Sequence, residues 1–274
     1  MLRRQSPGRW RGSMADVTFA SAARDLRHAL SPASWARDAL RWTPDEWQVR
    51  LLDSPRRRRI ALCSRQSGKS DTAAILALHQ ATFRPGSLVL LLAPSLRQAG
   101  ELLRKVKGHL RAMGATAPKV ERENLSELEL NGSRIMALPG DNPDSLRGIS
   151  APDLIILDEA AFVSKELVDV ILPFLAASPN GVLVLLSTPG VASGFFYESW
   201  HDASGRFEKI RVSAEQISRI TPDFLDEMRA RLGPRRFGSE FMCEWLTGDT
   251  SSVFGRSAIE AAFSENVPLL PIRF

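Results

Sequence analysis

The segment from Cys63 to Ser70, with the sequence CSRQSGKS, has the residue types that phosphate binding requires. Such a loop needs inward-pointing backbone N–H groups, a glycine where the backbone passes close to oxygen, a lysine for the β and γ phosphates and a hydroxyl for Mg²⁺. Cys63 takes the place of the first glycine of the usual pattern, so a chance turn is the alternative. We expect six loop residues to bind a nucleotide: Arg65, Gln66, Ser67, Gly68, Lys69 and Ser70.

Two adjacent acids, Asp158 and Glu159, follow the apolar run 154–157. Carboxylates at the end of a buried strand are costly to desolvate, so they usually face a cation or a polar network. We expect Asp158 and Ser70 to hold Mg²⁺, and Glu159 to orient and deprotonate an attacking water. The alternative is an N-cap pair at a strand-to-helix junction. The phosphate loop upstream favours the catalytic interpretation.

A third polar strand end, Ser187-Thr188-Pro189, follows the apolar run 182–186. Beside a Mg²⁺ site, Ser187 and Thr188 would sense the γ-phosphate and pass its loss to the rest of the domain. Serine or threonine before proline is equally common turn chemistry. The phosphate loop and the Asp158-Glu159 pair favour the coupling role for this segment.

These motifs need a scaffold that brings strand ends together. The runs 60–63, 88–93, 154–157 and 182–186 are apolar on both faces and alternate with helical patterns, as a buried parallel sheet requires. The pattern predicts an α/β fold, a three-layer P-loop NTPase sandwich of the ASCE or RecA-like type. Its central sheet is mainly parallel, and the nucleotide lies at the carboxyl ends of the strands.

Further local signals predict the surrounding elements. Asn131-Gly132 between alternating apolar residues predicts a β-hairpin. Thr43-Pro44-Asp45-Glu46 and Thr221-Pro222-Asp223 each combine an N-cap residue, a proline at the first helical position and an acid in the first turn. We assign residues 31–50 and 214–246 to a small helical lid beside the sheet.

The amino-acid composition limits the classes of protein to which the chain can belong. The chain has 274 residues, 44% of them hydrophobic, which is enough for a large core. Its two cysteines are too few for a disulfide framework, which fits a reducing compartment. No apolar run reaches the roughly 18 to 20 residues that cross a bilayer. We expect a soluble, cytoplasmic protein with no membrane partner.

The positive charge of the chain lies near its start. The first 60 residues hold 13 arginines against 6 acids, whereas the rest hold 23 basic and 25 acidic residues. The first 13 residues are rich in Arg, Gly and Ser without periodicity, and residues 1–30 are expected to form a basic, disordered arm. The net charge of +5 makes DNA binding plausible without establishing it.

The order of these motifs resembles that of the large terminase subunits of tailed bacteriophages. Pro44-Asp45-Glu46-Trp47-Gln48 resembles their adenine-recognition motif, in which Gln48 would pair with the base edge. The loop from Cys63 resembles their variant Walker A, which carries an arginine, here Arg65. The run 154–159 resembles their Walker B strand, and Ser187-Thr188-Pro189 resembles their coupling motif. Arg147, in the segment SLRG, resembles the arginine that is offered to a neighbouring subunit's nucleotide.

The resemblance implies an ATPase that uses ATP and Mg²⁺ to move double-stranded DNA into a prohead. Implied partners are a small terminase subunit, a portal protein and further copies in a ring, all in the cytoplasm of a bacterial host. The motifs place the ATPase domain at residues 31–246. Residues 247–274 would be a linker or the start of a nuclease domain, so nuclease activity is not expected. Another P-loop translocase or helicase-like ATPase and an inactive prophage remnant are the alternatives.

Overall fold

The computed structural model describes residues 19–141, 146, 148–149, 151–178 and 180–247. In this part of the chain one sheet of eight strands has the order β3-β4-β5-β2-β6-β7-β1-β8. The strands are β1 (Arg58–Cys63), β2 (Leu88–Ala93), β3 (Val120–Glu123), β4 (Glu127–Leu130), β5 (Ser133–Pro139), β6 (Leu154–Asp158), β7 (Val182–Ser187) and β8 (Glu208–Val212).

The sheet is mainly parallel, which confirms the predicted fold class. Every pairing among β5, β2, β6, β7, β1 and β8 is parallel, and only β4 runs antiparallel to its two neighbours. The predicted hairpin joins β4 to β5. Asn131 and Gly132 at its tip have φ of 52° and 68°, the left-handed pair that a tight hairpin turn requires.

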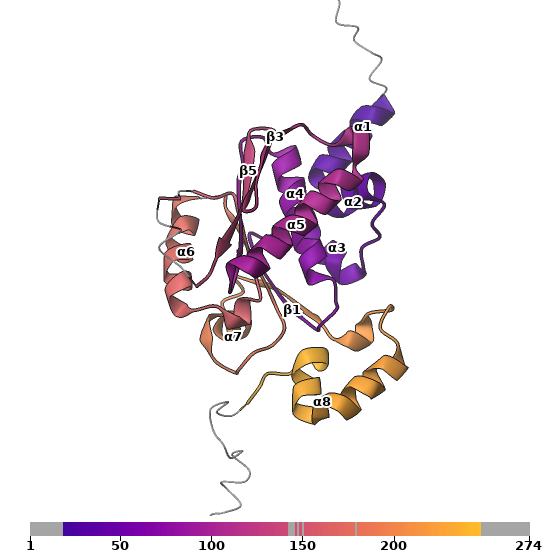
Figure 1. Cartoon of the computed structure of the whole chain (residues 1–274), viewed down its shortest axis with the longest axis vertical. Coiled ribbons are helices and arrows are strands. Elements are labelled where there is room, and N and C mark those ends of the chain that lie inside the picture. Colours follow the sequence, from indigo (N-terminus) through magenta and orange to yellow (C-terminus); the bar gives the residue numbers. More distant parts are fainter. Residues whose placement is uncertain (1–18, 142–145, 147, 150, 179, 248–274) are drawn as a thin grey trace, which may run out of the picture.

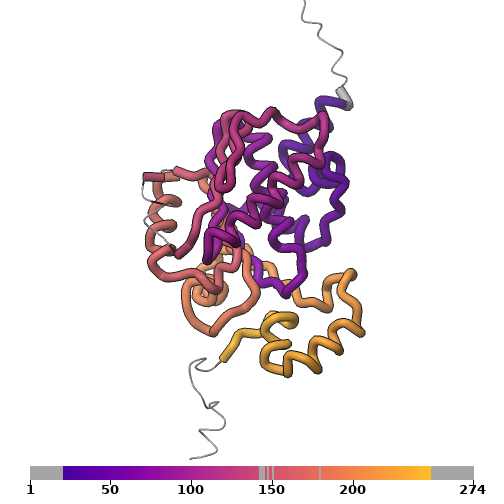
Figure 2. Tube along the Cα trace, in the orientation of Figure 1, coloured from indigo at the N-terminus to yellow at the C-terminus, as the bar shows by residue number. Residues whose placement is uncertain are grey.

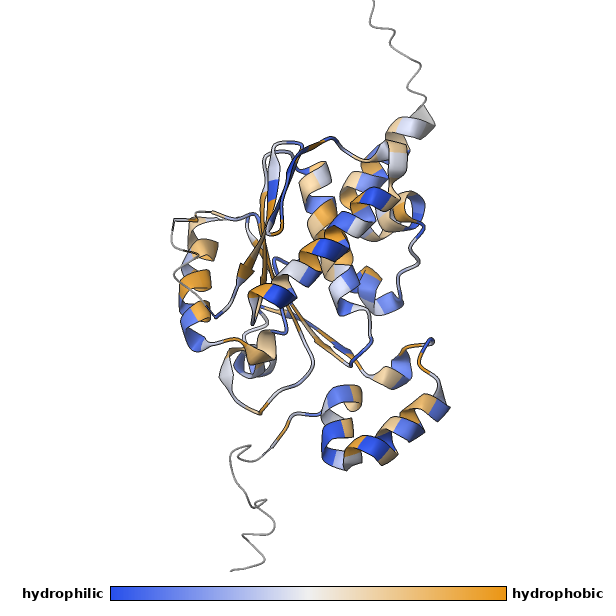
Figure 3. Cartoon of the chain, viewed as in Figure 1, coloured by the Kyte–Doolittle hydropathy of each residue, from blue (hydrophilic) through white to orange (hydrophobic). Residues whose placement is uncertain are grey.

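Helices cover both faces of the sheet (Figure 1). One layer contains α2 (Pro32–Leu40), α3 (Glu46–Leu52), α4 (Lys69–Phe83) and α5 (Leu96–Ala112), and the other contains α6 (Lys165–Ala177) and α7 (Gly194–His201). Alternate residues of β1 supply the two cores, because side chains along a strand point to opposite faces. Ala61 and Cys63 lie in the core under α4, whereas Ile60 and Leu62 lie in the other. Figure 3 shows the apolar strands between helices whose outer faces are polar.

The expected disordered arm is wrong for part of its length. Residues 1–18 lie outside the described part, but α1 (Phe19–Leu30) is a helix. Arg27 Nη2 and His28 Nε2 both lie 2.7 Å from Asp38 Oδ2 of α2, and His79 Nε2 of α4 lies 2.8 Å from the carbonyl oxygen of His28. The composition of the first residues indicated disorder, whereas these tertiary contacts hold residues 19–30 in a helix.

The two segments assigned to one lid touch at Arg219 and Asp45 but pack into different cores. Helices α2 and α3 pack on α4, and Trp35, Leu51 and Leu52 are part of the main core. By contrast, the 3₁₀ turn η4 (Ala214–Gln216) and α8 (Pro222–Met242) have a small core of their own. Figure 2 shows this last segment, in orange and yellow, below the rest of the chain. Of the two segments, only 214–246 therefore contains a helical unit with its own small core.

Helix α8 is bent in its middle. It runs from Pro222 to Met242, but Gly233 within it has φ 72° and ψ 165°, which are not helical values. Pro234 follows and cannot donate a backbone hydrogen bond, so the segment consists of two helices that meet at a kink at Gly233-Pro234. Phe237 and Phe241 beyond the kink are buried in the small core.

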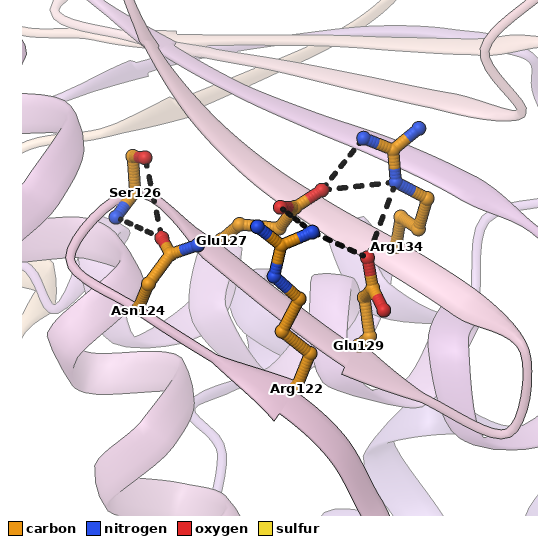
Figure 4. Close-up of polar contacts among 6 residues, drawn as sticks. All are labelled: Arg122, Asn124, Ser126, Glu127, Glu129 and Arg134. Atoms are coloured by element: carbon orange, nitrogen blue, oxygen red, sulfur yellow. Dashed lines mark hydrogen bonds and ion pairs between the residues drawn. The ribbon is translucent and has the colours of Figure 1, made fainter.

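Charge pairs fix the register of the antiparallel flank (Figure 4). Arg134 of β5 donates from Nε and Nη2 to Oε1 of the buried Glu127, at 2.9 and 2.6 Å. Arg122 of β3 lies 3.8 Å from both Glu127 and Glu129 of β4. Glu129 is directly opposite Arg134 in the ladder, so a shift by one residue would break the pairing.

Candidate functional site

The phosphate-loop residues lie between β1 and α4, where the sequence placed them. Gln66 and Gly68 have φ of 58° and 89°, in the left-handed region. A φ of 89° is strained for any residue with a Cβ, which favours glycine at position 68, and a Cβ there would also lie 2.9 Å from Gln48 Nε2 and 3.1 Å from Arg219 Nη2. Helix α4 begins at Lys69, and its N-terminal dipole favours an anion at this point. The loop has the backbone shape of an anion cradle.

The two predicted motifs meet at the carboxyl edge of the sheet. Lys69 Nζ lies 3.0 Å from Glu159 Oε1. Ser70 Oγ donates to Asp158 Oδ2 at 2.9 Å, although the two residues are 88 positions apart. The sheet thus brings together the proposed cation ligands and joins the proposed base to the phosphate-binding lysine.

The electrostatics of this cluster suit a cation. Burial raises the pKa of Asp158 above its usual value, and nearby Lys69 opposes that rise while Glu159 adds to it. For Lys69, burial alone would lower the pKa, but the carboxylates of Glu159 and Asp158 outweigh it and the pKa is raised. One ammonium therefore faces two carboxylates, and a divalent cation bound beside them would make the cluster positive overall, as a phosphate ligand requires.

Glu159 occupies an unusual backbone position. It has φ 55° and ψ 43° at the start of the 3₁₀ turn η3 (Ala160–Phe162). Left-handed backbone at a residue other than glycine is costly and often marks a functional site. Its Oε2 is buried and has no hydrogen-bond partner among the described residues. A buried oxygen in that state fits a site that binds a ligand or a water.

The remaining polar strand end contacts the loop after the acids. Ser187 is fully buried, and its Oγ accepts a hydrogen bond from the backbone N–H of Ala161 at 3.1 Å. Two residues further, the carbonyl of Pro189 accepts from Ser239 Oγ of α8, also at 3.1 Å. The predicted coupling segment therefore joins the loop that carries Glu159 to the C-terminal helix.

A cavity of about 710 Å³ opens beside these groups. Its lining includes Glu159 and Thr188 from the strand ends, Arg65 from the phosphate loop and the kink of α8. Arg65 Nε lies 3.3 Å from Glu240 Oε2, and its backbone N–H donates to the Glu240 carbonyl at 2.7 Å. Arg65 is thus held by α8 at the wall of the cavity.

Gln48 lies beside the phosphate loop and also caps a helix. It is 2% exposed, and its Oε1 accepts a hydrogen bond from the backbone N–H of Asp45 at 2.7 Å. This contact is half of a capping box that closes the start of α3. The Asp–x–x–Gln spacing in the sequence was the signal for it. The N-cap is Asp45, so the prediction of an N-cap at Thr43 with Pro44 as the first helical residue is wrong.

Three further residues bear on the predicted site. Cys63 is fully buried, and burial raises the pKa of its thiol, so the thiol is unreactive. Arg147 lies outside the described residues. Arg219 was not predicted, although it contacts the phosphate loop from 152 positions away. No motif or spacing in the sequence indicates that contact.

Comparison with known proteins agrees with this geometry. The family described as "Terminase large subunit, T4likevirus-type, N-terminal" matches residues 60–261. The chain is 30% identical over 214 residues to the terminase large subunit of Thermus virus P23-45, and the match covers 71% of this chain and 44% of that protein. The chain therefore spans less than half the length of this relative.

Solved structures share the fold. The Thermus phage P74-26 large terminase ATPase domain matches with a TM-score of 0.67 and 25% identity over 79% of this chain and 99% of that one. The large terminase of a thermophilic bacteriophage, in complex with ADP, has a TM-score of 0.58 at 11% identity, covering 81% of this chain and 53% of that one. Within the described residues, no helix is long and apolar enough to cross a bilayer.

Proposed function

The chain belongs to the terminase large subunit family, and we propose that it is the ATP-hydrolysing motor domain of a phage DNA-packaging enzyme. The observation that carries the proposal is the meeting of Lys69 with Glu159 and of Ser70 with Asp158 at one sheet edge. A phosphate-binding lysine, a hydroxyl, a buried acid and a candidate base within hydrogen-bond reach are the set that ATP hydrolysis needs.

Phosphate binding by the loop changes the partners of Lys69. In the structure its ammonium pairs with Glu159. The γ-phosphate of ATP competes for that ammonium, because a phosphate oxygen is a strong charge-assisted acceptor. Glu159 is then released from its ion pair and accepts a proton from the attacking water. The Lys69–Glu159 ion pair thus prevents Glu159 from acting as a base until ATP is bound.

Ser70 and Asp158 are the residues that would hold Mg²⁺. Both are oxygen ligands, and the buried negative charge around Asp158 fits a hard cation. Bound there, Mg²⁺ supplies neutralisation of the charge that develops on the phosphate oxygens. Gln48 is proposed to contact the adenine edge through its amide, and Arg65 to contact the phosphates across the cavity.

ATP hydrolysis is coupled to movement of α8 through the segment that contains Ser187 and Thr188. Ser187 Oγ is bonded to the N–H of Ala161, two residues after Glu159. A change in the Glu159 loop after phosphate release therefore alters the strand end that Ser239 of α8 contacts. We propose that this path moves α8 when the γ-phosphate is lost.

The wider assembly is proposed from the family. It comprises double-stranded DNA as the substrate that is moved, a small terminase subunit, a portal protein and a ring of copies in the host cytoplasm. In that ring Arg147 is offered to a neighbouring subunit's nucleotide. The family assignment favours this motor over a helicase-like ATPase.

Phosphate release from ATP tests the proposal. The purified chain should release phosphate with Mg²⁺ and stop when EDTA removes the cation. Lys69→Ala should lose MgATP binding and turnover, because the buried ammonium is the main positive charge for the phosphates. Lys165→Ala, which removes an exposed lysine at the start of α6, is the matched control. A folded chain that neither binds MgATP nor releases phosphate would refute the ATPase assignment.

A further inference from the structure

Arg219 joins three segments that lie far apart in the sequence. It lies between η4 and α8, and its Nη2 donates to the carbonyl of Gln66 at 3.2 Å and to the carbonyl of Ser67. Its Nη1 lies 2.8 Å from Oδ2 of Asp45, the N-cap of α3. One guanidinium therefore contacts the phosphate loop, the start of the Gln48 helix and the connection into α8.

The contact fixes the direction of two peptide groups. In a trans peptide the C=O and the following N–H point to opposite sides. The carbonyls of Gln66 and Ser67 face Arg219, so the N–H groups of Ser67 and Gly68 face away from it. Those N–H groups are the ones that a phosphate loop uses to hold a diphosphate.

The loop needs such a holder, because its conformation is strained. Gln66 has φ 58°, which costs free energy for a residue with a Cβ. At Gly68, a Cβ would lie 3.1 Å from Arg219 Nη2, so the guanidinium packs against the position that favours glycine. Arg219 thus supports the loop from the side opposite to the inward N–H groups.

We propose that Arg219 is a positioning residue for the nucleotide, an inference that rests on the proposed ATPase function. It holds the Gln66 and Ser67 peptides in the orientation that binds the diphosphate of ATP or ADP. Arg219 lies in the connection that leads into α8. The position of α8 therefore affects the affinity of the phosphate loop for nucleotide. A displaced α8 would release the two carbonyls and weaken binding.

A purely structural role makes a different prediction. If Arg219 only fastens α8 to the domain, its loss lowers the unfolding temperature and leaves phosphate binding unchanged. If it positions the loop, its loss weakens binding of every ligand that carries a diphosphate, inorganic pyrophosphate included. Turnover at saturating ATP then stays near the wild-type value, because Lys69 and Glu159 are untouched.

The experiment compares Arg219→Ala and Arg219→Lys with wild type. Dissociation constants for MgADP and pyrophosphate are measured by calorimetry, with KM and kcat for ATP. In Arg219→Ala the two constants and KM should rise about 10- to 100-fold, the range for a lost hydrogen bond to a charged group. Arg219→Lys should recover part of the loss, because an ammonium still donates but lacks the planar fork. Arg231→Ala, an exposed arginine of α8, should behave as wild type.

Other outcomes overturn the proposal. Arg219 would have no positioning role if the dissociation constants were unchanged in folded Arg219→Ala, or if kcat fell at unchanged KM. In either case, ATP hydrolysis by the wild type would still support the ATPase assignment. If Arg219→Ala does not fold, Arg219→Gln replaces it and decides by the same criteria. A wild-type chain that binds neither MgADP nor pyrophosphate would overturn both proposals.

Discussion

Buried charges lie near both ends of β1, and their surroundings differ. Arg59, near the start of the strand, is 7% exposed, and its guanidinium donates to four backbone carbonyls. Those carbonyls belong to Leu51, Leu52, Ser54 and Arg56. Burial lowers the pKa of Arg59 to about 10, so the group stays charged at neutral pH. The hydrogen bonds of this guanidinium to the described residues all go to backbone carbonyls, as expected of a structural group.

Beyond the other end of β1, the buried charges are incompletely matched. Lys69 faces both Glu159 and Asp158, and Glu159 Oε2 has no partner in the described part of the chain. Glu159 also keeps a left-handed backbone. Burial of a charge therefore does not by itself identify a functional group. The unmatched oxygen and the strained backbone distinguish the site from the structural arginine.

The largest expected effect is on catalysis at Glu159. Glu159→Gln should lower kcat about 10²- to 10⁴-fold, the usual contribution of a general base. MgATP binding should persist, because the phosphate loop and Lys69 remain. Single-turnover phosphate release and equilibrium binding measure the two quantities. Glu166→Gln, the same change at an exposed position of α6, is the control, and wild-type turnover in Glu159→Gln would remove the base assignment.

Arg59 should show the opposite pattern. Arg59→Met should lower the free energy of unfolding by about 3 to 5 kcal/mol, because it leaves buried carbonyls without donors. Below the unfolding transition, kcat should remain near the wild-type value. Urea denaturation gives the stability. Arg56→Met removes an exposed arginine of the same run and should change stability by less than about 0.5 kcal/mol. Equal stabilities of the two variants would contradict the structural role.

The smallest expected effect is at Gln48, which has both a structural role, as a helix cap, and a proposed role in nucleotide binding. Gln48→Ala should reduce the preference for ATP over GTP about 3- to 10-fold, the worth of one hydrogen bond, and should also weaken the cap of α3. Gln48→Glu separates the two roles, because glutamate preserves the capping acceptor but lacks the amide donor. Competition binding measures the preference and thermal unfolding measures the cap. An unchanged preference in both variants would leave Gln48 with the capping role alone.

The sequence was most informative where the structure is local. The loop around Lys69, the acids after β6 and the Asn131-Gly132 hairpin follow from residue types within a few positions of one another. The parallel sheet follows from runs of apolar residues. Strand ends in such a sheet meet at one edge, and Ser70 and Asp158 therefore lie together as expected.

Long-range contacts away from the shared edge of the sheet could not be predicted. Arg56 and Arg59 belong to one run of four arginines, yet only the fold shows that Arg59 is buried under a turn of carbonyls. The same is true of Arg219, whose partners Gln66 and Ser67 are more than 150 positions away. Helix α1 was missed because its stability comes from contacts with Asp38 and His79 rather than from composition.

The strand order has a mechanical consequence for the site. Strand β7 lies between β6 and β1, so the acids and the phosphate loop are carried by strands that are not neighbours. With a spacing of about 4.8 Å between adjacent strands, their backbones are roughly 10 Å apart. Strand β7 pairs with both strands across that distance, and side chains span it at Lys69–Glu159 and Ser70–Asp158. These two side-chain contacts can therefore change partners without breaking a backbone hydrogen bond of the sheet. The sheet keeps the distance between the two strands constant while the contacts change.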